Sequence, residues 1–591
     1  MGLIFHDLIS FNDAFDTIKN NTKKIDDYED IDVADSAGRI TVDDIYSTNN
    51  LPLFSRSQVD GYAVISDDIK NADYNNPVKL IMSGETYIGE SGVKHPGNGE
   101  CIKVPTGGVI PVGADAMVPF EDTKEDGEKI IFFKSVPKFN EISNPGIDVV
   151  KGERIINRYT AINTGHISVL SSVGIKKIRV FRKMRIGIIS TGNELLNPGD
   201  PYTDGKVYES NGIAIKAEVS KYSAFSVNSY GIIKDEYNSI KNTIDRSVNE
   251  NDITVTVGST SAGDHDMVYK IFDGYEPGII FHGVRVKPGK PFVFAKNNDK
   301  VLFGLPGFPV SSMMILYSLV IPNLFNMLNY EYNTFNVNAT TGERFKLHSG
   351  STDLLLIKLL NRNNNYYAYQ VHGNSGSISR IMKATGFSII DSKSDYLKEG
   401  EKINVNIFSY NIPEILIYGE YSPLMEKIPY NIMNKAIFVE SNYSNISGSM
   451  EKNEGDLYIT NSEAKNDDYL EFKFNIPLAL IYNRKDYRSV AVLYKGTGLY
   501  SYSIKNIKSN NITYLDNTDV ICDYVRNNRC DAGIVYLSDA LKYSMNYDAV
   551  DNIPFYFYLY KQSKYFNEIK LFFDDINDSN NIREKQRKIE R

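Results

Sequence analysis

The chain has 591 residues, of which 42% are hydrophobic and 24% charged, and its formal net charge is −9. This length exceeds one hydrophobic core, so we expect about three to five domains. The acidic balance excludes an overall basic footprint for nucleic acid. The three cysteines, Cys101, Cys522 and Cys530, form no CxxC pair and no disulfide framework, which favours a reducing cytoplasm.

The N-terminal segment, MGLIFHDLISFNDAFD, carries acidic residues early and lacks the basic start and long apolar core of a signal peptide. No run of ~18 apolar residues is present, so we expect no membrane span. Residues 7–24 have helical spacing. Residues 28–140 are rich in Gly, Pro and short β-branched runs and predict a compact β module, and the chain then passes through turns into a helix at GHISVLSSVG.

From residue 184 strands and helices alternate. MRIGIIST, FSVNSYGII and DITVTVG read as buried strands, and IAIKAEVSKY and YNSIKNTIDRSVN read as helices. Alternation of this kind predicts a parallel α/β sheet. Residues 332–408 return to a β-rich pattern, and residues 411–591 start a second α/β rhythm with EILIYGEYSPLMEKI.

Glycine-containing turns follow three strands of the first α/β region: STGNEL (190–195), GSTSAGDHD (258–266) and GLPGFPVS (304–311). Turns at the carboxyl ends of parallel strands gather at one crevice, where ligands bind. The second turn has two interpretations. Its small residues and two acids suit a phosphate cradle with a bridging cation, or a plain N-capping turn.

Further candidates lie outside these turns. VKPGKP (286–291) places Lys287 and Lys290 beside rigid prolines, which suits an anionic ligand. RSQVDGYAV (56–64) puts Asp60 at a turn, and VPTGGVIPVGADAMVPFED (104–122) sets Thr106 in a Gly-rich turn. Each of these turns alone is also compatible with a purely structural role.

Taken together, the motifs resemble the molybdopterin molybdenumtransferase family, the MoeA and gephyrin E-domain group. The resemblance rests on RSQVDGYA, VPTGGVIPVGADAMV, STGNEL, ESNG, GSTSAGDHDM, VKPGKP and GLPGFPVS, which occur in the family's order.

The resemblance implies a multidomain α/β chain and a homodimer whose cleft is shared between subunits. It implies a helical linker domain (1–27 and 141–180), an inserted β domain (28–140), a MogA-like α/β domain (181–330) and a small β-barrel (331–408). More weakly, residues 409–591 resemble a periplasmic-binding-protein-like α/β domain related to LysR-type substrate-binding modules.

The implied reaction is the insertion of molybdate into adenylylated molybdopterin with release of AMP, assisted by Mg²⁺. By similarity the catalytic set is Asp60, Thr106, Asp148, Glu194, Asp235, Asp266 and Lys287, with Glu194 and Asp266 near the metal. The implied substrate-binding residues are Gly192, Ser210, Asn211, Gly258, Ser259, Ser261, Gly263, Lys290, Pro306 and Pro309. His265 is interpreted as incidental, because Mg²⁺ prefers oxygen ligands.

The sequence departs from the family at three positions: Ser259 replaces a usual glycine, Phe308 a usual asparagine and Gly283 a frequent lysine. These changes bear on substrate contacts and on the choice of molybdate over tungstate. In the last domain, Ser422, Thr497 and Ser538 are candidate ligands for an oxyanion or a pterin, or they close ordinary turns.

Two other functions remain open from the sequence. One is a non-catalytic molybdopterin- or oxyanion-binding regulatory protein on the same scaffold. The other is a molybdopterin adenylyltransferase, which would not need the flanking β domains; such an enzyme is otherwise a candidate partner. Neither nucleic acid nor a membrane is an expected partner, and we expect a cytoplasmic location.

Overall fold

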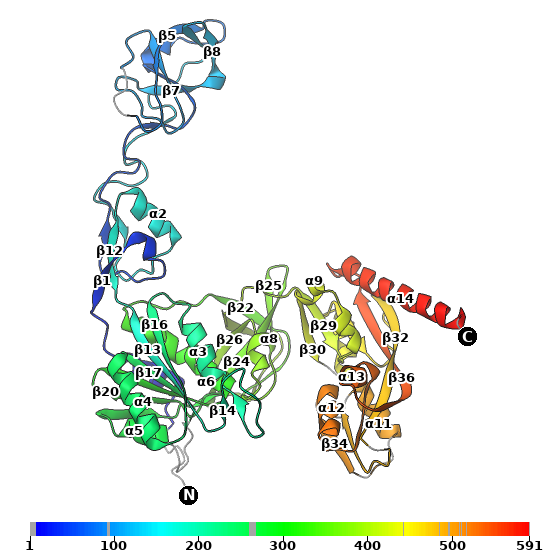
Figure 1. The fold of residues 1–591 in the computed structure, drawn as a ribbon. Helices are drawn as coiled ribbons and strands as arrows, with labels where there is room; N and C mark the ends of the chain where they lie inside the picture. The colour runs from blue at the N-terminus through cyan, green and yellow to red at the C-terminus, as the bar shows by residue number, and fades with distance from the viewer. Residues whose placement is uncertain are drawn as a thin grey trace. The chain divides into compact units, whose positions relative to one another are not determined.

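In the computed structural model the chain divides into two compact units, Met1–Asn333 and Thr334–Arg591 (Figure 1). The structure describes residues 8–90, 95–258, 267–440, 443–483, 485–493, 497–506, 509, 511–515 and 517–589.

The first unit begins with a linker layer. Helix α1 (Phe11–Asn21) starts at Ser10, whose side chain accepts a hydrogen bond from the Asp13 N–H, as expected for an N-cap. Strand β1 (Tyr28–Asp32) pairs with β12 (Lys177–Phe181), and β2 (Ile45–Tyr46) pairs with β11 (Arg154–Ile156). Helix α2 (Thr164–Ser172) and the 3-10 turn η1 (Val33–Asp35) complete this layer.

These pairings correct one predicted boundary. The sequence predicts a β domain over residues 28–140, but β1 and β2 pair with strands that follow residue 140. The reason is that antiparallel strands that pair can be far apart in sequence, whereas a shift in composition marks only a change in local secondary-structure pattern. The strands from Tyr28 to Tyr46 therefore belong to the linker layer.

The β module itself is a six-stranded sheet in the order β7-β4-β6-β5-β9-β8. Its strands are β4 (Gly61–Val64), β5 (Val78–Glu85), β6 (Glu100–Val104), β7 (Ala116–Pro119), β8 (Thr123–Asp126) and β9 (Lys129–Phe132), with 3-10 turns η2 (Ser66–Ile69) and η3 (Phe120–Asp122). Short strands β3 (Arg56–Ser57) and β10 (Ile142–Ser143) pair at its base. Tyr62 and Phe132 are among its fully buried side chains.

The α/β layer of the first unit has the strand order β16-β13-β17-β21-β20-β18. The strands are β13 (Met184–Thr191), β16 (Phe225–Ile233), β17 (Ile253–Val257), β18 (Pro277–His282), β20 (Val293–Asn297) and β21 (Lys300–Leu305), with short strands β14 (Leu195–Leu196), β15 (Val207–Tyr208) and β19 (Val286–Lys287). The helices are α3 (Asn211–Val219), α4 (Tyr237–Glu250), α5 (Met267–Asp273), α6 (Pro309–Ile315) and α7 (Ile321–Met327). Strands β16, β13, β17 and β21 are parallel, as the alternation predicts.

A π-helical turn, η4 (Leu316–Val320), joins α6 to α7 in one helical stretch. This stretch, Pro309–Met327, is long and apolar enough by composition to cross a membrane, and 83% of its apolar window is buried in the protein. Its apolar pattern is interrupted by serines and by Asn323, so it contains no unbroken apolar run of that length. Burial in the first unit accounts for its composition.

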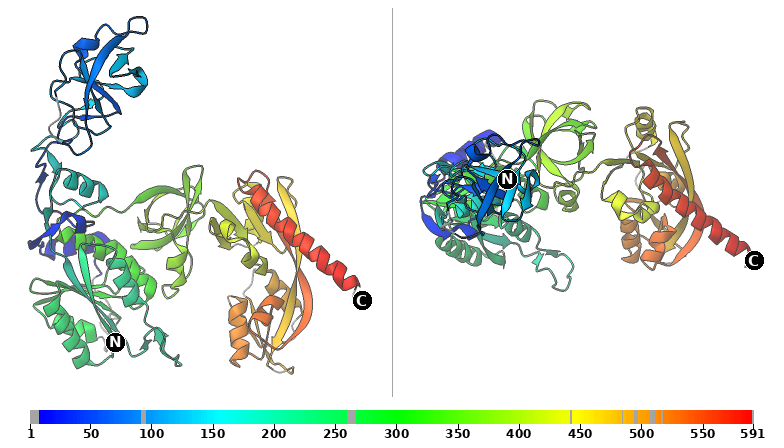
Figure 2. Two further views of the ribbon diagram at one scale, coloured as in Figure 1. Left: turned by 45° about the horizontal axis from the view of Figure 1, so that its top comes forward. Right: turned by 90° about the horizontal axis from the view of Figure 1, so that it is seen from above.

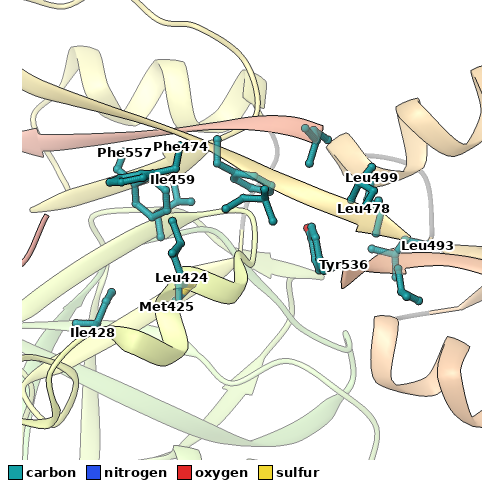
Figure 3. Close-up of a cluster of buried hydrophobic side chains, with 14 of the residues drawn as sticks. Leu424, Met425, Ile428, Ile459, Phe474, Leu478, Leu493, Leu499, Tyr536 and Phe557 are labelled. Atoms are coloured by element: carbon teal, nitrogen blue, oxygen red, sulfur yellow. The ribbon is translucent and has the colours of Figure 1, made fainter. Parts of the chain in front are cut away.

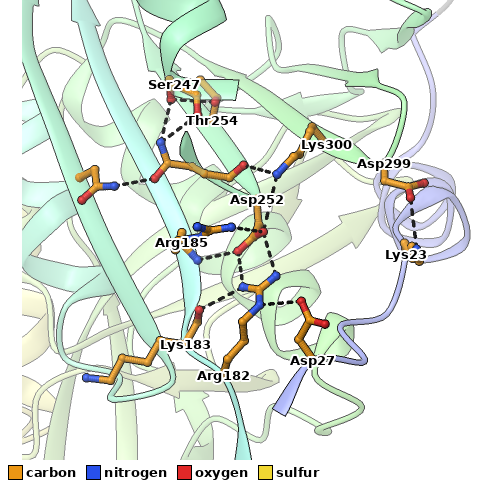
Figure 4. A network of polar contacts seen from close by, with 12 residues as sticks. Lys23, Asp27, Arg182, Lys183, Arg185, Ser247, Asp252, Thr254, Asp299 and Lys300 are labelled. Atoms are coloured by element: carbon orange, nitrogen blue, oxygen red, sulfur yellow. Dashed lines mark hydrogen bonds and ion pairs between the residues drawn. The ribbon is translucent and has the colours of Figure 1, made fainter. Parts of the chain in front are cut away.

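A polar network ties the linker layer to this α/β layer (Figure 4). Arg182 donates two hydrogen bonds to Asp252, of 2.7 and 3.0 Å, and one to Asp27, of 2.9 Å. The Asp252 carboxylate also accepts the backbone N–H of Arg185 at 2.8 Å. Since Asp252 is buried, these partners compensate its charge.

The second unit opens with a barrel whose strand order is β24-β25-β22-β28-β26, with β26 pairing back onto β24. The elements are β22 (Asn336–Thr341), β23 (Phe345–Lys346), β24 (Ser351–Arg362), β25 (Asn365–Gln370), α8 (Ser379–Lys383), β26 (Gly386–Ser392), β27 (Tyr396–Leu397) and β28 (Lys402–Ile407). Ile357, Leu359 and Ala368 are fully buried in its interior.

The last domain has two lobes joined by two long antiparallel strands, β32 (Tyr469–Tyr482) and β36 (Tyr547–Tyr560). The lobe that follows the barrel in the chain, called the near lobe, holds β29 (Ile415–Gly419), η5 (Pro423–Lys427), α9 (Tyr430–Met433), β30 (Ala436–Glu440), α10 (Tyr443–Glu451) and β31 (Leu457–Thr460). The far lobe holds β33 (Ser489–Leu493), α11 (Gly498–Asn506), β34 (Asn511–Leu515), α12 (Thr518–Arg526), β35 (Ala532–Tyr536) and α13 (Leu537–Lys542).

The two lobes repeat one arrangement within an eight-stranded sheet of order β30-β29-β31-β36-β32-β35-β33-β34. In each lobe three neighbouring parallel strands are paired, at one side, with one of the long strands. One buried apolar cluster, which includes Leu424, Phe474 and Leu499, runs through both lobes (Figure 3). Helix α14 (Phe566–Ile589) follows the long strands (Figure 2), and Phe573 stacks on Phe472 with ring centroids 4.8 Å apart.

Candidate functional site

The parallel strands of the first unit bring several sequence-predicted residues to one edge. Strands β16, β13, β17 and β21 are neighbours and run in the same direction. Their carboxyl ends lead to Asp235, to Gly192–Glu194, to Gly258 and to Pro306–Pro309. The edge of this sheet is therefore where a ligand crevice is expected in an open α/β fold.

The first turn is locked to the strand beside it. The Asn193 N–H donates to the Asp235 carboxylate, and the Asp235 N–H donates to the Asn193 side-chain oxygen, both at 3.1 Å. The Gly192 N–H donates to the Ile233 carbonyl at 3.2 Å. Asp235 thereby holds the turn in place, and Glu194 next to it is exposed to solvent.

The second turn touches both the first and the third. Gly258 has a φ of +98°, and a Cβ there would lie 2.6 Å from the Thr191 carbonyl oxygen, so only glycine fits. The Gly258 N–H donates to the Leu305 carbonyl at 3.2 Å, and a Cβ on Gly307 would lie 3.7 Å from the Gly258 Cα. Ser259, Ser261, Gly263, His265 and Asp266 lie outside the described residues.

A buried carboxylate occupies the start of helix α3. Glu209 is 7% exposed and accepts the N–H groups of Gly212 at 2.6 Å and Ile213 at 3.3 Å, together with the Ser190 hydroxyl at 3.1 Å. Ser210 stands at the N-cap position, and its side chain makes no capping bond. An anionic ligand would therefore have to compete with Glu209 for these two N–H groups.

Asn211 links α3 to the third turn. Its side-chain N–H donates to the Gly307 carbonyl at 2.6 Å. Its side-chain oxygen is buried and has no hydrogen-bond partner among the described residues. A buried acceptor without a partner is costly, so this atom suits a ligand N–H or O–H entering the crevice.

The remaining crevice residues lie on rigid segments. Pro306 is buried, Phe308 is 63% exposed, and Pro309 is the first residue of α6. Lys287 and Lys290 are exposed on the connection between β18 and β20, which begins at Gly283. This connection packs on α6, because a Cβ at Gly289 would meet the Ile315 side chain at 2.7 Å.

Asp60 and Thr106 are joined on two loops of the β module, and Asp148 lies on the segment between β10 and β11. The Asp60 carboxylate accepts the Thr106 N–H at 2.8 Å, which fixes the Gly-rich turn against the Asp60 loop. The Asp148 N–H donates to the Leu51 carbonyl at 3.0 Å, and all three side chains are exposed. No hydrogen bond or ion pair among the described residues joins these three residues to the α/β turns.

Metal ligands were predicted at Glu194 and Asp266. In the described part of the chain no group of three or more His, Cys, Asp or Glu side chains is placed to hold a metal ion. Asp266 lies outside that part, so only the exposed Glu194 carboxylate can be placed. A carboxylate donor fits Mg²⁺, which binds through one or two carboxylates and substrate phosphates.

In the last domain, Ser422 and Thr497 follow equivalent strands of the two lobes. The Ser422 hydroxyl is fully buried and accepts the Leu424 N–H at 3.4 Å, and the Thr497 hydroxyl oxygen accepts the Tyr500 N–H at 3.0 Å. Ser538 is exposed in the first turn of α13. Ser422 and Thr497 thus cap local turns, which is the structural alternative left open by the sequence.

The region between the lobes is acidic. The Tyr536 hydroxyl of the far lobe donates to the Tyr421 carbonyl of the near lobe at 3.3 Å. Asp539 accepts the Thr518 hydroxyl at 2.6 Å, and burial together with the Asp519 charge raises its pKa despite that bond. Glu420 is also buried there. Carboxylates repel anions, so this region disfavours a free oxyanion.

Sequence reasoning missed two residues of the first crevice. ESNG was recognised, but Ser210 and Asn211 were selected from it and Glu209 was passed over. Asn193 was likewise not assigned, although it forms the reciprocal bonds with Asp235. The available signal was local: an acid directly before a helix start is a typical partner of the first N–H groups.

Comparisons with known proteins cover the first two thirds of the chain. Family profiles match residues 9–174 as "MoeA N-terminal region (domain I and II)", 187–326 as "Probable molybdopterin binding domain" and 338–408 as "MoeA C-terminal region (domain IV)". The last domain lies beyond these matches, so its description rests on its own fold.

Individual relatives agree with the profiles. A Methanocaldococcus jannaschii chain named for molybdopterin biosynthesis is 31% identical over 386 residues, 64% of this chain and 91% of the relative. A molybdopterin molybdenumtransferase of Staphylococcus epidermidis is 33% identical over 279 residues, 47% of this chain and 66% of the relative. A crystal structure of the Pyrococcus horikoshii MoeA protein is 30% identical with a TM-score of 0.59, covering 68% of this chain and 100% of its own.

Proposed function

The chain belongs to the MoeA family of molybdopterin biosynthesis proteins, and on this premise we propose that it is a molybdopterin molybdenumtransferase. The family domains and the transferase relatives support a role in molybdenum cofactor biosynthesis. In the proposed reaction water hydrolyses the pyrophosphate bond of adenylylated molybdopterin and AMP leaves. The two dithiolene sulfurs bind the metal of molybdate, and one oxo group leaves as water with the two thiol protons.

The proposal is supported by a series of contacts that links Asn211 to all three turns. The side chain of Asn211 bonds the third turn, the third turn touches Gly258, and Gly258 packs on Thr191 of the first. The buried side-chain oxygen of Asn211 has no partner among the described residues, which suits a ligand with hydrogen-bond donors. A pterin carries such donors as ring N–H and exocyclic amino groups. Backbone groups of the turns and the buried side-chain amide of Asn211 can therefore orient a ligand in the crevice.

Within the crevice, Glu194 is the proposed metal-facing carboxylate, and Asp266 is proposed to join it. Mg²⁺, when bound, would neutralise charge on the pyrophosphate as AMP leaves. Asp235 acts through Asn193 by holding the turn that carries Glu194. Lys287 and Lys290 supply positive charge for the anionic substrate from the connection before β20.

We further propose a homodimer in which Asp60, Thr106 and Asp148 enter the crevice of the second copy. The support is that no hydrogen bond or ion pair among the described residues joins them to the α/β turns of their own chain, and that the Asp60–Thr106 bond fixes two of the three loops. Retention of these three residues favours the transferase over the two alternatives, a non-catalytic binding protein and an adenylyltransferase. We place the reaction in the cytoplasm.

For the last domain we propose a periplasmic-binding-protein-like fold with a small ligand between its lobes. The support is the repeated arrangement of strands and the two long crossing strands. The buried Glu420 and Asp539 favour a ligand that carries hydrogen-bond donors over molybdate itself.

The test is molybdate-dependent AMP release from adenylylated molybdopterin by the full chain. Glu194→Gln removes the proposed metal-facing charge at an exposed site, so the fold should persist while the rate falls by about 10²-fold or more. Asp204→Asn is the matched control, because Asp204 is an exposed carboxylate between β14 and β15. A wild-type rate in Glu194→Gln would remove the proposed role of Glu194, and absence of AMP release by the wild-type chain would remove the transferase function.

A further inference from the structure

Two apolar residues on the outside of the barrel are buried. In a strand, alternate side chains point to opposite faces. Leu359 of β24 and Ala368 of β25 face the barrel core, so Leu360 and Tyr369 face outward, yet they are only 1% and 6% exposed. Something other than the barrel must cover them.

The cover is the near lobe of the last domain. Leu360 and Tyr369 share one buried cluster with residues of the near lobe and of the long strands: Leu416, Tyr418, Ile437, Ile446, Met450, Tyr458, Tyr469, Tyr556 and Tyr558. Tyrosines make up much of this cluster, and burial raises the pKa of Tyr369 and of Tyr418 above their ordinary value. The hairpin β24–β25 therefore packs on one face of the near-lobe sheet.

A partly buried charge pair lies at the end of the same hairpin. Arg362, the last residue of β24, donates to the Asp456 carboxylate at 3.1 Å. The same carboxylate accepts the Leu416 N–H at 2.8 Å and the Ser563 hydroxyl at 2.8 Å. The Asp456 side chain is 10% exposed and that of Arg362 is 30% exposed. Asp456 thus joins the barrel, the near lobe and the segment before α14.

A cavity of about 410 Å³ lies beside this pair, and Arg362, Asp456, Glu414 and Lys564 are among its lining residues. Its two cations are already engaged, Arg362 with Asp456 and Lys564 with Glu414 at 2.7 Å. The lining charges balance one another, so the cavity itself points to no charged ligand.

We propose that the hairpin β24–β25 is the docking surface of the near lobe and that the barrel and the last domain form one rigid body, clamped at Asp456. The last domain is then an extension of the barrel with a fixed orientation. A chain cut after residue 408 would uncover Leu360 and Tyr369, so a truncated protein would not report the activity of an intact barrel.

The direct test is a distance measurement between spin labels in the full chain. Met382 on α8 of the barrel and Tyr430 on α9 of the near lobe are 81% and 79% exposed, so both can be replaced by labelled cysteine. The three native cysteines are buried. If the two domains form one rigid body, the labelled but otherwise unchanged chain gives a narrow distance distribution. Arg362→Met should broaden this distribution and lower the midpoint of thermal unfolding by roughly 6–12 °C.

The matched control is Lys452→Met. Lys452 and Glu399 connect the same two domains at 3.6 Å, but their side chains are 62% and 51% exposed, so loss of this pair should leave the distribution unchanged. A broad distribution in the unchanged chain overturns the proposal, as does a narrow one in Arg362→Met. If Arg362→Met does not fold, Arg362→Lys is measured instead. A distance distribution broader than that of Lys452→Met then supports the proposed clamp at Asp456, and an equal distribution overturns it.

Discussion

The two units of the molecule each hold a buried aspartate directly before a parallel strand: Asp252 before β17 and Asp456 before β31. In each, the aspartate N–H donates to a carbonyl on the neighbouring strand, of Arg185 or of Leu416, and the carboxylate accepts the N–H of the same residue at 2.8 Å. In each, an arginine from an adjoining layer supplies the positive charge.

The two arginines differ in how they reach the carboxylate. Arg182 directly follows β12, makes two hydrogen bonds to Asp252 and is also bound by Asp27. Arg362 comes from the barrel, 94 residues from Asp456 in sequence, and makes one bond, while Ser563 takes the other carboxylate oxygen. The first joint is secured by more bonds, whereas the second depends on the docking of two domains.

The far lobe has a third aspartate of this kind and a different partner. Asp531 precedes β35, accepts the Ser489 N–H at 2.8 Å and donates its own N–H to the Ser489 carbonyl at 3.2 Å. Here the Ser489 hydroxyl also donates to the carboxylate, at 2.8 Å. In all three places the aspartate closes the start of a strand pair, and where an arginine is added it attaches a neighbouring layer.

The largest expected effect is at the first joint. Asp252→Ala leaves Arg182 in a partly buried position with Asp27 as its remaining carboxylate partner. Loss of one partner of a buried pair costs about 3–5 kcal/mol, so the free energy of unfolding of the first unit should fall by about 3 kcal/mol. Urea unfolding followed by a probe in the α/β layer measures it.

The pH dependence checks the same carboxylate. Burial alone would raise the pKa of Asp252, but hydrogen bonds from Arg182 and from the Arg185 N–H outweigh it and lower the pKa. A lowered pKa means that its stabilising contribution is present above about pH 4 and is lost as pH falls further. Asp252→Asn should flatten the acid limb of the stability curve; an unchanged limb would contradict this account.

An intermediate effect separates the two joints. Arg182→Lys and Arg362→Lys both keep the charge, but lysine cannot reproduce a two-bond fork. We expect a loss of about 2 kcal/mol at Arg182 and about 1 kcal/mol at Arg362, measured by urea unfolding of the full chain. Equal losses would show that the number of bonds does not distinguish the joints.

The smallest effect is expected in the far lobe. Ser489→Ala removes the hydroxyl that donates to the Asp531 carboxylate and accepts the Asp531 N–H at 3.0 Å, and it keeps the two bonds made by the Ser489 backbone. The unfolding free energy should fall by about 1 kcal/mol. Ser509→Ala, which removes a hydroxyl bound to the Arg488 carbonyl at 2.7 Å on the exposed surface, is the control and should change stability less.

Part of the candidate site could be predicted from the sequence. Buried β-branched runs such as ITVTV, each followed by a glycine turn, determine that β13, β17 and β21 end at one edge, because parallel strands place their turns together. The motifs also determined family membership. Glu209 at the start of α3 was within reach of the same reasoning.

The tertiary structure decided what depends on distant packing. The pairing of β1 with β12, the partnerless oxygen of Asn211 and the burial of Leu360 are set by elements far away along the chain. Arg362 and Asp456 show the physical reason: a surface arginine and a strand-end aspartate are ordinary in sequence, and only the docking of two domains removes them from water and makes each depend on the other.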